Sequence, residues 1–153
     1  LKVLVAKEKL KQLNEAAVVE LTEEYLNDDN GLNVVGDADI IIDATDNIQA
    51  RQLIDQISKE FGIPMVYGGL YRYEGQVAVL NVNGSPGYSD LFPEPPSVND
   101  NCADAGVLGM LPGIIGHIQA LETVKLIVGI EPNLVGKLLV YDGMKHSMET
   151  IEL

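Results

Sequence analysis

A run of three isoleucines that ends in an acidic turn constrains the fold of this chain more than any other feature. Residues 39–43 read Asp-Ile-Ile-Ile-Asp, and this β-branched run predicts a short strand buried on both faces. An amphipathic helix follows, with Asp46 or Asn47 as its N-cap, and it stops before Gly62 and Pro64. Its apolar stripe comprises Ala50, Leu53, Ile54, Ile57 and Phe61. A buried strand followed at once by such a helix is typical of an α/β sheet.

Apolar periodicity outlines the remaining elements. We expect helices over residues 1–13 and 113–128, one or two helical turns over 28–35, and strands over 18–21, 65–67, 76–82, 138–141 and 148–153. The strand at 76–82 follows its predecessor too closely for a crossover helix, which predicts antiparallel pairing. The order predicts one domain, residues 1–153, with a three-layer, Rossmann-like, doubly wound α/β sheet. Its first half is expected to be parallel, and its second half to add antiparallel strands.

Two segments in the second half have opposite character. The helix at 113–128 has apolar residues at helical spacing, namely Ile114, Ile118, Leu121, Val124 and Val128. The segment before it, about residues 83–105, contains four prolines and reads as a long irregular loop. Within it, residues 94–101 hold Val98 as their one apolar side chain apart from the prolines, too little to offset the entropy of ordering. We therefore expect a mobile crossover loop.

The charge and cysteine content exclude several classes of function. Ten Lys and Arg residues against 23 Asp and Glu residues give a net charge of −13, which argues against binding to nucleic acid or anionic membranes. The longest apolar run, residues 106–116, is too short for a membrane span, and no signal peptide is visible. A single cysteine permits no internal disulfide and fits a cytoplasmic protein. Because the chain begins with Leu1, we expect a processed chain or a fragment.

The turn after the isoleucine run holds the main candidate residue, Asp46. Ligands of open α/β sheets bind at the carboxyl ends of the strands, where this turn is expected. Asp46 could hold Mg²⁺ on a nucleotide, because Mg²⁺ prefers one or two carboxylates together with phosphate oxygens. Alternatively, Asp46 is a helix N-cap, with Gln49 completing a capping box. Asp43 would then fix the turn, and Arg51 could reach a phosphate or pair with a carboxylate.

Three further residues have both a functional and an ordinary interpretation. Lys2 and His117 fit solvated or satisfied positions on helices, and Cys102 is a lone thiol in a polar loop. The chain contains neither a G-x-G-x-x-G motif nor a P-loop, so it lacks the usual phosphate cradle of a nucleotide-binding domain. The pair Gly68-Gly69 lies on the wrong side of the predicted nucleotide strand to replace it.

Several motifs in one order resemble the ThiF/MoeB/HesA family, the bacterial relatives of ubiquitin-activating enzymes. They are residues 39–47 with Arg51, Tyr67-Gly68-Gly69, Gly75-Gln76-Val77, Leu91-Phe92-Pro93-Glu94, residues 101–109, Gln119-Ala120-Leu121-Glu122, Lys125-Leu126 and Tyr141-Asp142-Gly143. The resemblance spans the whole chain but covers only the second half of the family's domain. The chain would thus be an incomplete ThiF-type adenylation domain without the opening strand and glycine-rich loop.

The resemblance implies a function and a set of site residues. Family members use ATP to adenylate the C-terminal glycine of a small ubiquitin-like protein, typically a sulfur carrier of the ThiS or MoaD type. By resemblance, Asp46 binds Mg-ATP, and Lys2, Asn47 and Arg51 complete the nucleotide-binding set. Cys102 matches a cysteine that links covalently to the carrier in thiamin-type members. The resemblance also implies a homodimer, and we expect the fragment alone to be inactive.

The chain departs from the family pattern at its zinc site. Many members have Cys-x-x-Cys before Leu-Phe-Pro, and the corresponding positions here are Gly87 and Asp90. The partner cysteine pair near the C-terminus is also absent, and four thiolates are unavailable in a chain with one cysteine. We therefore expect no structural zinc.

Two other classes of function remain open at this level. One is a noncatalytic module that docks a ubiquitin-like protein without activating it, which an upstream G-x-G-x-x-G motif would exclude. The other is an NAD(P)-dependent oxidoreductase with the same kind of sheet. The Thr45-Asp46-Asn47 turn and the long proline-containing loop argue against the second class.

Overall fold

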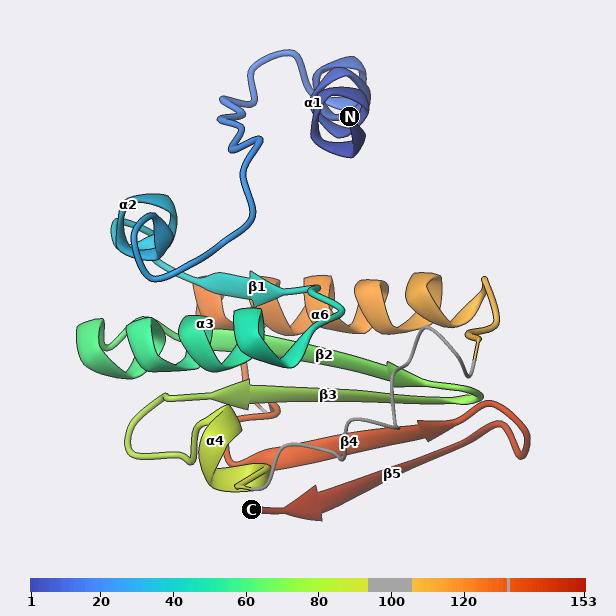
Figure 1. The fold of residues 1–153 in the computed structure, drawn as a ribbon. Coiled ribbons are helices and arrows are strands. Elements are labelled where there is room, and N and C mark those ends of the chain that lie inside the picture. The colour runs from blue at the N-terminus through green and yellow to red at the C-terminus, as the bar shows by residue number, and fades with distance from the viewer. Residues whose placement is uncertain (94–105, 132) are drawn as a thin grey trace.

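A computed structural model describes residues 1–93, 106–131 and 133–153, and its centre is one five-stranded sheet (Figure 1). The strands lie in sequence order and are β1 (Ile41–Asp43), β2 (Met65–Tyr71), β3 (Glu74–Leu80), β4 (Lys137–Asp142) and β5 (Ser147–Glu152). β1 pairs with β2 in parallel, and every later pair is antiparallel. This confirms the predicted mixed sheet, including the antiparallel return of β3 along β2.

Helices cover both faces of the sheet and make three layers. α3 (Ile48–Phe61) and the short α4 (Tyr88–Leu91) lie on one face, and α6 (Leu111–Val128) lies on the other (Figure 1). α2 (Gly31–Val35) contacts α3. Alternate residues of β2 and β3 point to the two faces, so each face has its own core cluster. Met65, Tyr67 and Leu80 lie in the cluster under α3, and Val66, Val77 and Val79 in the cluster under α6.

The N-terminal part differs from expectation in one element. α1 (Lys2–Leu13) forms where helical spacing predicts it, but none of its residues is buried. The strand predicted at 18–21 is wrong, because these residues have no regular structure and Val18 is 91% exposed. Strand propensity is realised only where a neighbouring strand supplies hydrogen bonds, and this segment lies away from the sheet (Figure 1).

The buried face of α6 matches the predicted stripe only in part. Its buried residues are Leu111, Ile115, Gln119 and Glu122. Ile114 and Ile118 of the predicted stripe pack partly buried against the core, whereas Leu121, Val124 and Val128 are exposed. α6 is apolar on most sides, so apolar spacing alone does not identify the face that packs. By length and composition it is also the one helix among the described residues that could cross a membrane, a weak criterion that core helices of soluble proteins also meet.

Within the described residues of the predicted irregular segment there is one helix. α4 covers Tyr88–Leu91, and the buried carboxylate of Asp55 on α3 accepts hydrogen bonds from the backbone N–H groups of Tyr88, at 2.7 Å, and Ser89, at 3.0 Å. Residues 94–105 lie outside the described part of the chain. The predicted mobility of the crossover loop therefore stays a prediction.

Candidate functional site

β1 ends at Asp43, whose side chain shapes the turn that follows. Its carboxylate is fully buried, and Oδ1 accepts hydrogen bonds from the backbone N–H of Thr45, at 2.9 Å, and from the Thr45 hydroxyl, at 2.6 Å. An aspartate that binds the backbone two residues ahead is a common way to close a turn. The expectation that Asp43 fixes this turn is confirmed.

Asn47 caps the helix that begins after the turn. Its side-chain oxygen accepts a hydrogen bond from the N–H of Ala50 at 2.8 Å, and its backbone is extended, as an N-cap requires. The alternative in which Asp46 caps α3 together with Gln49 is therefore wrong. Because the Asp43–Thr45 interaction closes the turn early, the N-cap geometry falls on residue 47.

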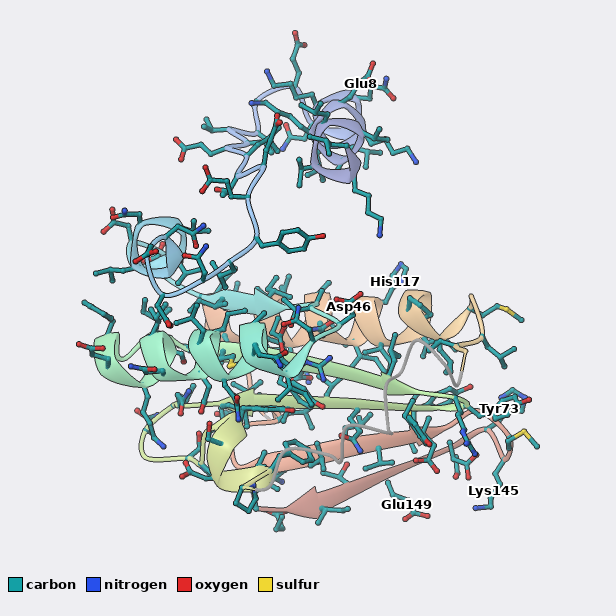
Figure 2. All side chains as sticks on the ribbon, viewed as in Figure 1. Glu8, Asp46, Tyr73, His117, Lys145 and Glu149 are labelled. Carbon is teal, nitrogen blue, oxygen red and sulfur yellow. The ribbon has the colours of Figure 1, made fainter. Side chains whose placement is uncertain are left out.

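Asp46 lies between the Asp43–Thr45 interaction and the Asn47 cap, and its carboxylate is in solvent. The residue is exposed, and within the described part of the chain its side chain has neither a hydrogen bond nor an ion pair. It lies just beyond the carboxyl end of β1, close to the α6 side of the sheet (Figure 2). A turn with hydrogen bonds on both sides of Asp46 thus presents a free carboxylate at the edge where α/β proteins bind ligands.

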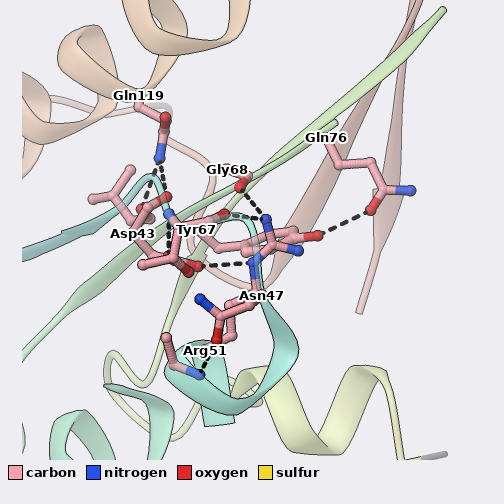
Figure 3. Close-up of polar contacts among 10 residues, drawn as sticks. Asp43, Asn47, Arg51, Tyr67, Gly68, Gln76 and Gln119 are labelled. Atoms are coloured by element: carbon pink, nitrogen blue, oxygen red, sulfur yellow. Dashed lines mark hydrogen bonds and ion pairs between the residues drawn. The ribbon is translucent and has the colours of Figure 1, made fainter. Parts of the chain in front are cut away.

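Arg51 joins the turn to the neighbouring strand. Its Nη2 donates hydrogen bonds to the backbone oxygens of Thr45, at 2.7 Å, and Gly68, at 3.2 Å (Figure 3). Its Nε lies 3.4 Å from Oδ2 of Asp43, an ion pair without hydrogen-bond geometry. The guanidinium also stacks over the Tyr67 ring, 5.3 Å from the ring centroid. Of the two roles left open for Arg51, the structure contains the ion pair with a carboxylate.

Burial dominates the electrostatics of Asp43. Loss of hydration raises the pKa of this carboxyl above its usual 3.8, although the Thr45 hydrogen bonds and the nearby Arg51 act in the opposite direction. Asp43 is therefore suited to hold structure. The exposed Asp46 is the carboxylate of this turn that a cation from solvent can reach.

A cavity of about 230 Å³ adjoins the turn. Its lining includes Thr45, Asp46, Arg51, Gly68, Leu70, Val107, Ile115 and Gln119. Small-molecule sites usually measure about 300–1,000 Å³, so this cavity has room for only part of a nucleotide. A more open cavity of about 900 Å³ lies at the amino ends of β1 and β2, beside Asp39 and Pro64, and none of the predicted site residues lines it.

The sequence pattern of the ThiF family matches residues 1–153. The chain belongs to the ThiF family. It is 37% identical over 157 residues to a sulfur carrier protein adenylyltransferase of Thermus thermophilus, covering 98% of this chain and 58% of that protein. It is 41% identical over 141 residues to a SAMP-activating enzyme E1 of Haloferax volcanii, covering 91% of this chain and 52% of that protein. An adenylyltransferase and sulfurtransferase MOCS3 of Culex quinquefasciatus is 40% identical over 154 residues, covering 99% of this chain and 35% of that protein.

Solved structures show the same fold at lower sequence identity. The E. coli MccB structure with ATP has a TM-score of 0.81 at 15% identity, covering 99% of this chain and 48% of that chain. The PaaA structure has a TM-score of 0.76 at 24% identity, covering 99% of this chain and 55% of that chain. This ThiF-family chain thus spans from about a third to somewhat over half of the length of the relatives described above.

Two predicted site residues of the ThiF-family chain lie away from this cavity or outside the described residues. Lys2 opens α1, which Figure 1 shows apart from the sheet, and it is exposed. Cys102 lies outside the described residues. The structure therefore brings Asp46, Asn47 and Arg51 together around one turn, and the roles of Lys2 and Cys102 stay predictions.

Sequence spacing alone does not identify two residues beside the turn. Gln119 belongs to a family motif that carries no assigned role, and Gly68 belongs to a glycine pair. In the structure, Gln119 of α6 donates hydrogen bonds to the backbone oxygens of Asp43 and Val66 beside the turn (Figure 3). A polar residue four positions after Ile115 on an apolar helix was the available signal, because a buried amide needs partners.

The positions that hold zinc ligands in many ThiF-family members form a helix cap here. Asp90 accepts a hydrogen bond from the N–H of Gly87 at 2.8 Å and pairs with Lys59 at 2.7 Å. Over the part of the chain that the structure describes, no group of three or more His, Cys, Asp or Glu side chains is arranged to hold a metal ion. The absence of structural zinc itself stays a prediction.

Proposed function

We propose that the protein containing this chain uses ATP to adenylate the C-terminal glycine carboxylate of a small ubiquitin-like sulfur carrier. The observation that carries this proposal is the free, exposed carboxylate of Asp46 at the carboxyl end of a parallel strand. The names of the relatives, such as sulfur carrier protein adenylyltransferase, support the choice of reaction.

In the proposed reaction, an oxygen of the carrier carboxylate attacks the α-phosphorus of ATP. The bond from this phosphorus to the bridging oxygen breaks, pyrophosphate leaves, and an acyl-adenylate remains. Asp46 fits as a ligand of Mg²⁺, because its carboxylate is exposed and has no partner among the described residues. When bound, Mg²⁺ would supply positive charge for the phosphate oxygens. Arg51 and Asp43 hold the turn, and Leu70 and Ile115 supply an apolar wall to the cavity.

The chain supplies part of the site under this proposal. It has no glycine-rich phosphate loop, and its cavity holds only part of a nucleotide. The rest of the nucleotide site would come from sequence that the longer relatives possess. We accordingly expect the 153-residue chain to be inactive alone, with Lys2, Asn47 and Arg51 contributing to a larger nucleotide site.

Several finer statements belong to the same proposal. The protein acts in the cytoplasm as a homodimer, it uses Mg²⁺ and no structural zinc, and its partners include neither nucleic acid nor membrane. The net charge of −13 supports the last statement. Cys102 would link covalently to the carrier: its thiolate would attack the carbonyl carbon of the acyl-adenylate, and AMP would leave as the thioester bond forms.

The decisive experiment replaces Asp46 in the full-length protein. Asp46→Ala should lower carrier-dependent ATP–pyrophosphate exchange by about 100-fold or more, because it removes an electrostatic interaction with the reacting phosphates. Folding should change by less than about 0.5 kcal/mol, since the side chain is exposed and caps no helix. Asp39→Ala is the matched control, because Asp39 is an exposed aspartate at the other end of the same strand.

The outcomes separate the alternatives. Exchange at a near wild-type rate in Asp46→Ala would remove Asp46 from the mechanism. A wild-type protein that binds a carrier but never exchanges pyrophosphate would instead be a noncatalytic docking module. Saturable binding of NAD(P)H to the wild-type protein would favour the oxidoreductase class.

A further inference from the structure

Gln119 is a buried polar residue in an otherwise apolar contact between α6 and the sheet. It is 4% exposed and lies one turn after Ile115 on the buried face of α6. Its Nε2 donates hydrogen bonds to the backbone oxygens of Asp43, at 2.8 Å, and Val66, at 3.1 Å. Both of its amide N–H groups therefore have partners on the sheet.

The two acceptors belong to neighbouring strands. Asp43 is the last residue of β1, and Val66 lies in β2, where it pairs with Ile42. One side chain from α6 thus ties the end of β1 to β2 from outside the sheet (Figure 3). A primary amide suits this role because it carries two N–H donors on one nitrogen, and a hydroxyl carries only one donor.

Gly68 makes room for this contact. A Cβ atom built at Gly68 would lie 2.4 Å from Cδ of Gln119, closer than real Cβ contacts occur. The carbonyl of Gly68 accepts the Arg51 hydrogen bond at 3.2 Å. Gly68 is therefore the point where Gln119 from one face of the sheet and Arg51 from the other meet beside the turn.

We propose that Gln119 is a positioning residue for Asp46, and that residue 68 is glycine because any side chain would displace the Gln119 amide. Asp46 has no side-chain contact of its own among the described residues, so its place depends on the backbone around it. Gln119 holds the residue before the turn, Asp43, and Arg51 holds its middle, Thr45. The mechanistic part of this inference rests on the proposed function, whereas the structural part does not.

The test uses variants of Gln119 and Gly68 in the full-length protein. Gln119→Met keeps an unbranched side chain of similar length and removes both donors. Gly68→Ala keeps Gln119 and adds the conflicting methyl group. The matched control is Thr123→Val, which removes a polar contact one turn further along α6, the hydrogen bond from the Thr123 hydroxyl to the Gln119 carbonyl.

Hydrogen exchange measured by mass spectrometry is the primary readout. In Gln119→Met, amide exchange in residues 44–51 should accelerate by about tenfold. The loss of one or two hydrogen bonds, each with a net contribution of about 1 kcal/mol, changes the opening equilibrium by about this factor. Peptides covering β3 and β4 should keep the wild-type rate, and Thr123→Val should leave residues 44–51 unchanged. Equal acceleration in every core peptide, or no change at the turn, would overturn the proposal.

A double variant decides the question if Gln119→Met fails to fold. Gly68→Ala with Gln119→Ala should be more stable than Gly68→Ala alone, because the new methyl group occupies the space that the glutamine leaves. The amides of residues 44–51 should nevertheless exchange as fast as in Gly68→Ala, because the two hydrogen bonds from the Gln119 side chain are still missing. A double variant with both stability and turn protection restored would show that Gln119 only fills space.

Enzyme kinetics separate this inference from the proposed function. In Gln119→Met, the Mg²⁺ concentration for half-maximal pyrophosphate exchange should rise severalfold and kcat should fall, with the melting temperature near that of the control. An unchanged Mg²⁺ dependence in a variant with a loosened turn would overturn the positioning role. If the wild-type protein shows no pyrophosphate exchange, the proposed function fails. Hydrogen exchange at the turn then still tests whether Gln119 holds Asp43 and Val66 together.

Discussion

Two aspartates three residues apart have opposite environments in this chain. Asp43 is fully buried and has its carboxylate occupied by Thr45 and Arg51, whereas Asp46 is exposed and has no partner among the described residues. The first shapes the turn, and the second is available to a ligand. Local sequence does not separate these roles, because both are acidic residues next to the same turn.

The titration of Asp43 should reflect its burial. We expect its carboxyl to titrate above 3.8, because the loss of hydration outweighs the Thr45 hydrogen bonds and Arg51. Since the folded pKa is raised, the folded state binds more protons than the unfolded state between the two pKa values. The contribution of Asp43 to stability is therefore present below pH 3.8 and is lost as the pH rises through the folded pKa.

Carboxyl-carbon NMR of the chain checks this expectation. Asp90 and Asp142 serve as internal references, because hydrogen bonds from Lys59 and Lys145 lower their pKa values below 3.8. Arg51→Met should raise the Asp43 midpoint further by removing a nearby positive charge. A wild-type Asp43 midpoint at or below 3.8 would mean that Thr45 and Arg51 outweigh burial.

At the scale of elements, α3 connects the candidate site to the start of the crossover segment. Its first turns carry Asn47 as the N-cap and Arg51, and its later turns carry Asp55 and Ser58. The carboxylate of Asp55 accepts three hydrogen bonds, two from the start of α4 and one from the side chain of Asn81 at 3.0 Å. The orientation of α3 therefore affects both the turn and α4.

Removing the Asp55 carboxylate should be costly. Asp55→Ala removes the acceptor of the backbone N–H groups of Tyr88, which is buried, and Ser89, which is exposed, while the Asn81 amide keeps the Ser58 oxygen as a partner. An unsatisfied buried donor costs about 1–3 kcal/mol, so we expect a loss of that size in the free energy of unfolding. Urea denaturation measures this quantity.

The control for Asp55 lies on the same helix. Glu60→Ala removes an exposed carboxylate of α3 and should change stability by less than about 0.5 kcal/mol. Equal effects of the two substitutions would show that Asp55 does not hold α4 against α3.

At the scale of the whole molecule, helices cover the sheet around β1, β2 and β3, and α6 remains apolar on its outer side. Leu121, Val124, Ile127 and Val128 are all more than half exposed there. Contiguous apolar surface of this kind marks interaction sites in soluble proteins. The proposed homodimer gives this surface a function, since a second copy could cover it.

Sedimentation of the full-length protein tests this use of α6. The wild-type protein should sediment as a dimer, and Ile127→Glu should shift it toward monomer, because a charge buried in an apolar interface is costly. Met144→Glu is the control, because Met144 is 69% exposed, like Ile127 at 68%, but lies between β4 and β5. A dimer that survives Ile127→Glu unchanged would exclude the outer face of α6 from the interface.

Much of this protein is readable from local sequence. A strand, a turn and a helix within residues 39–62 are encoded locally. The isoleucine run forms the strand, and Asp43 forms the turn by binding Thr45. Asn47 caps the start of the helix, and Gly62, in the left-handed conformation, ends it. Periodicity also predicted the mixed sheet and the antiparallel return of β3. The strand, the turn, the helix and the return of β3 along β2 depend on residues close in the chain, so their pattern was sufficient to predict them.

Tertiary structure alone decided which face of α6 is buried, whether residues 18–21 form a strand, and the role of Gln119. α6 packs where Gly68 and Gly75 leave space on the sheet, with Gln119 and Ile115 filling it. The acceptors of Gln119 are 76 and 53 residues away in sequence. Periodicity describes one element at a time, whereas the shape of the opposing surface and the presence of a neighbouring strand are set by residues distant in sequence.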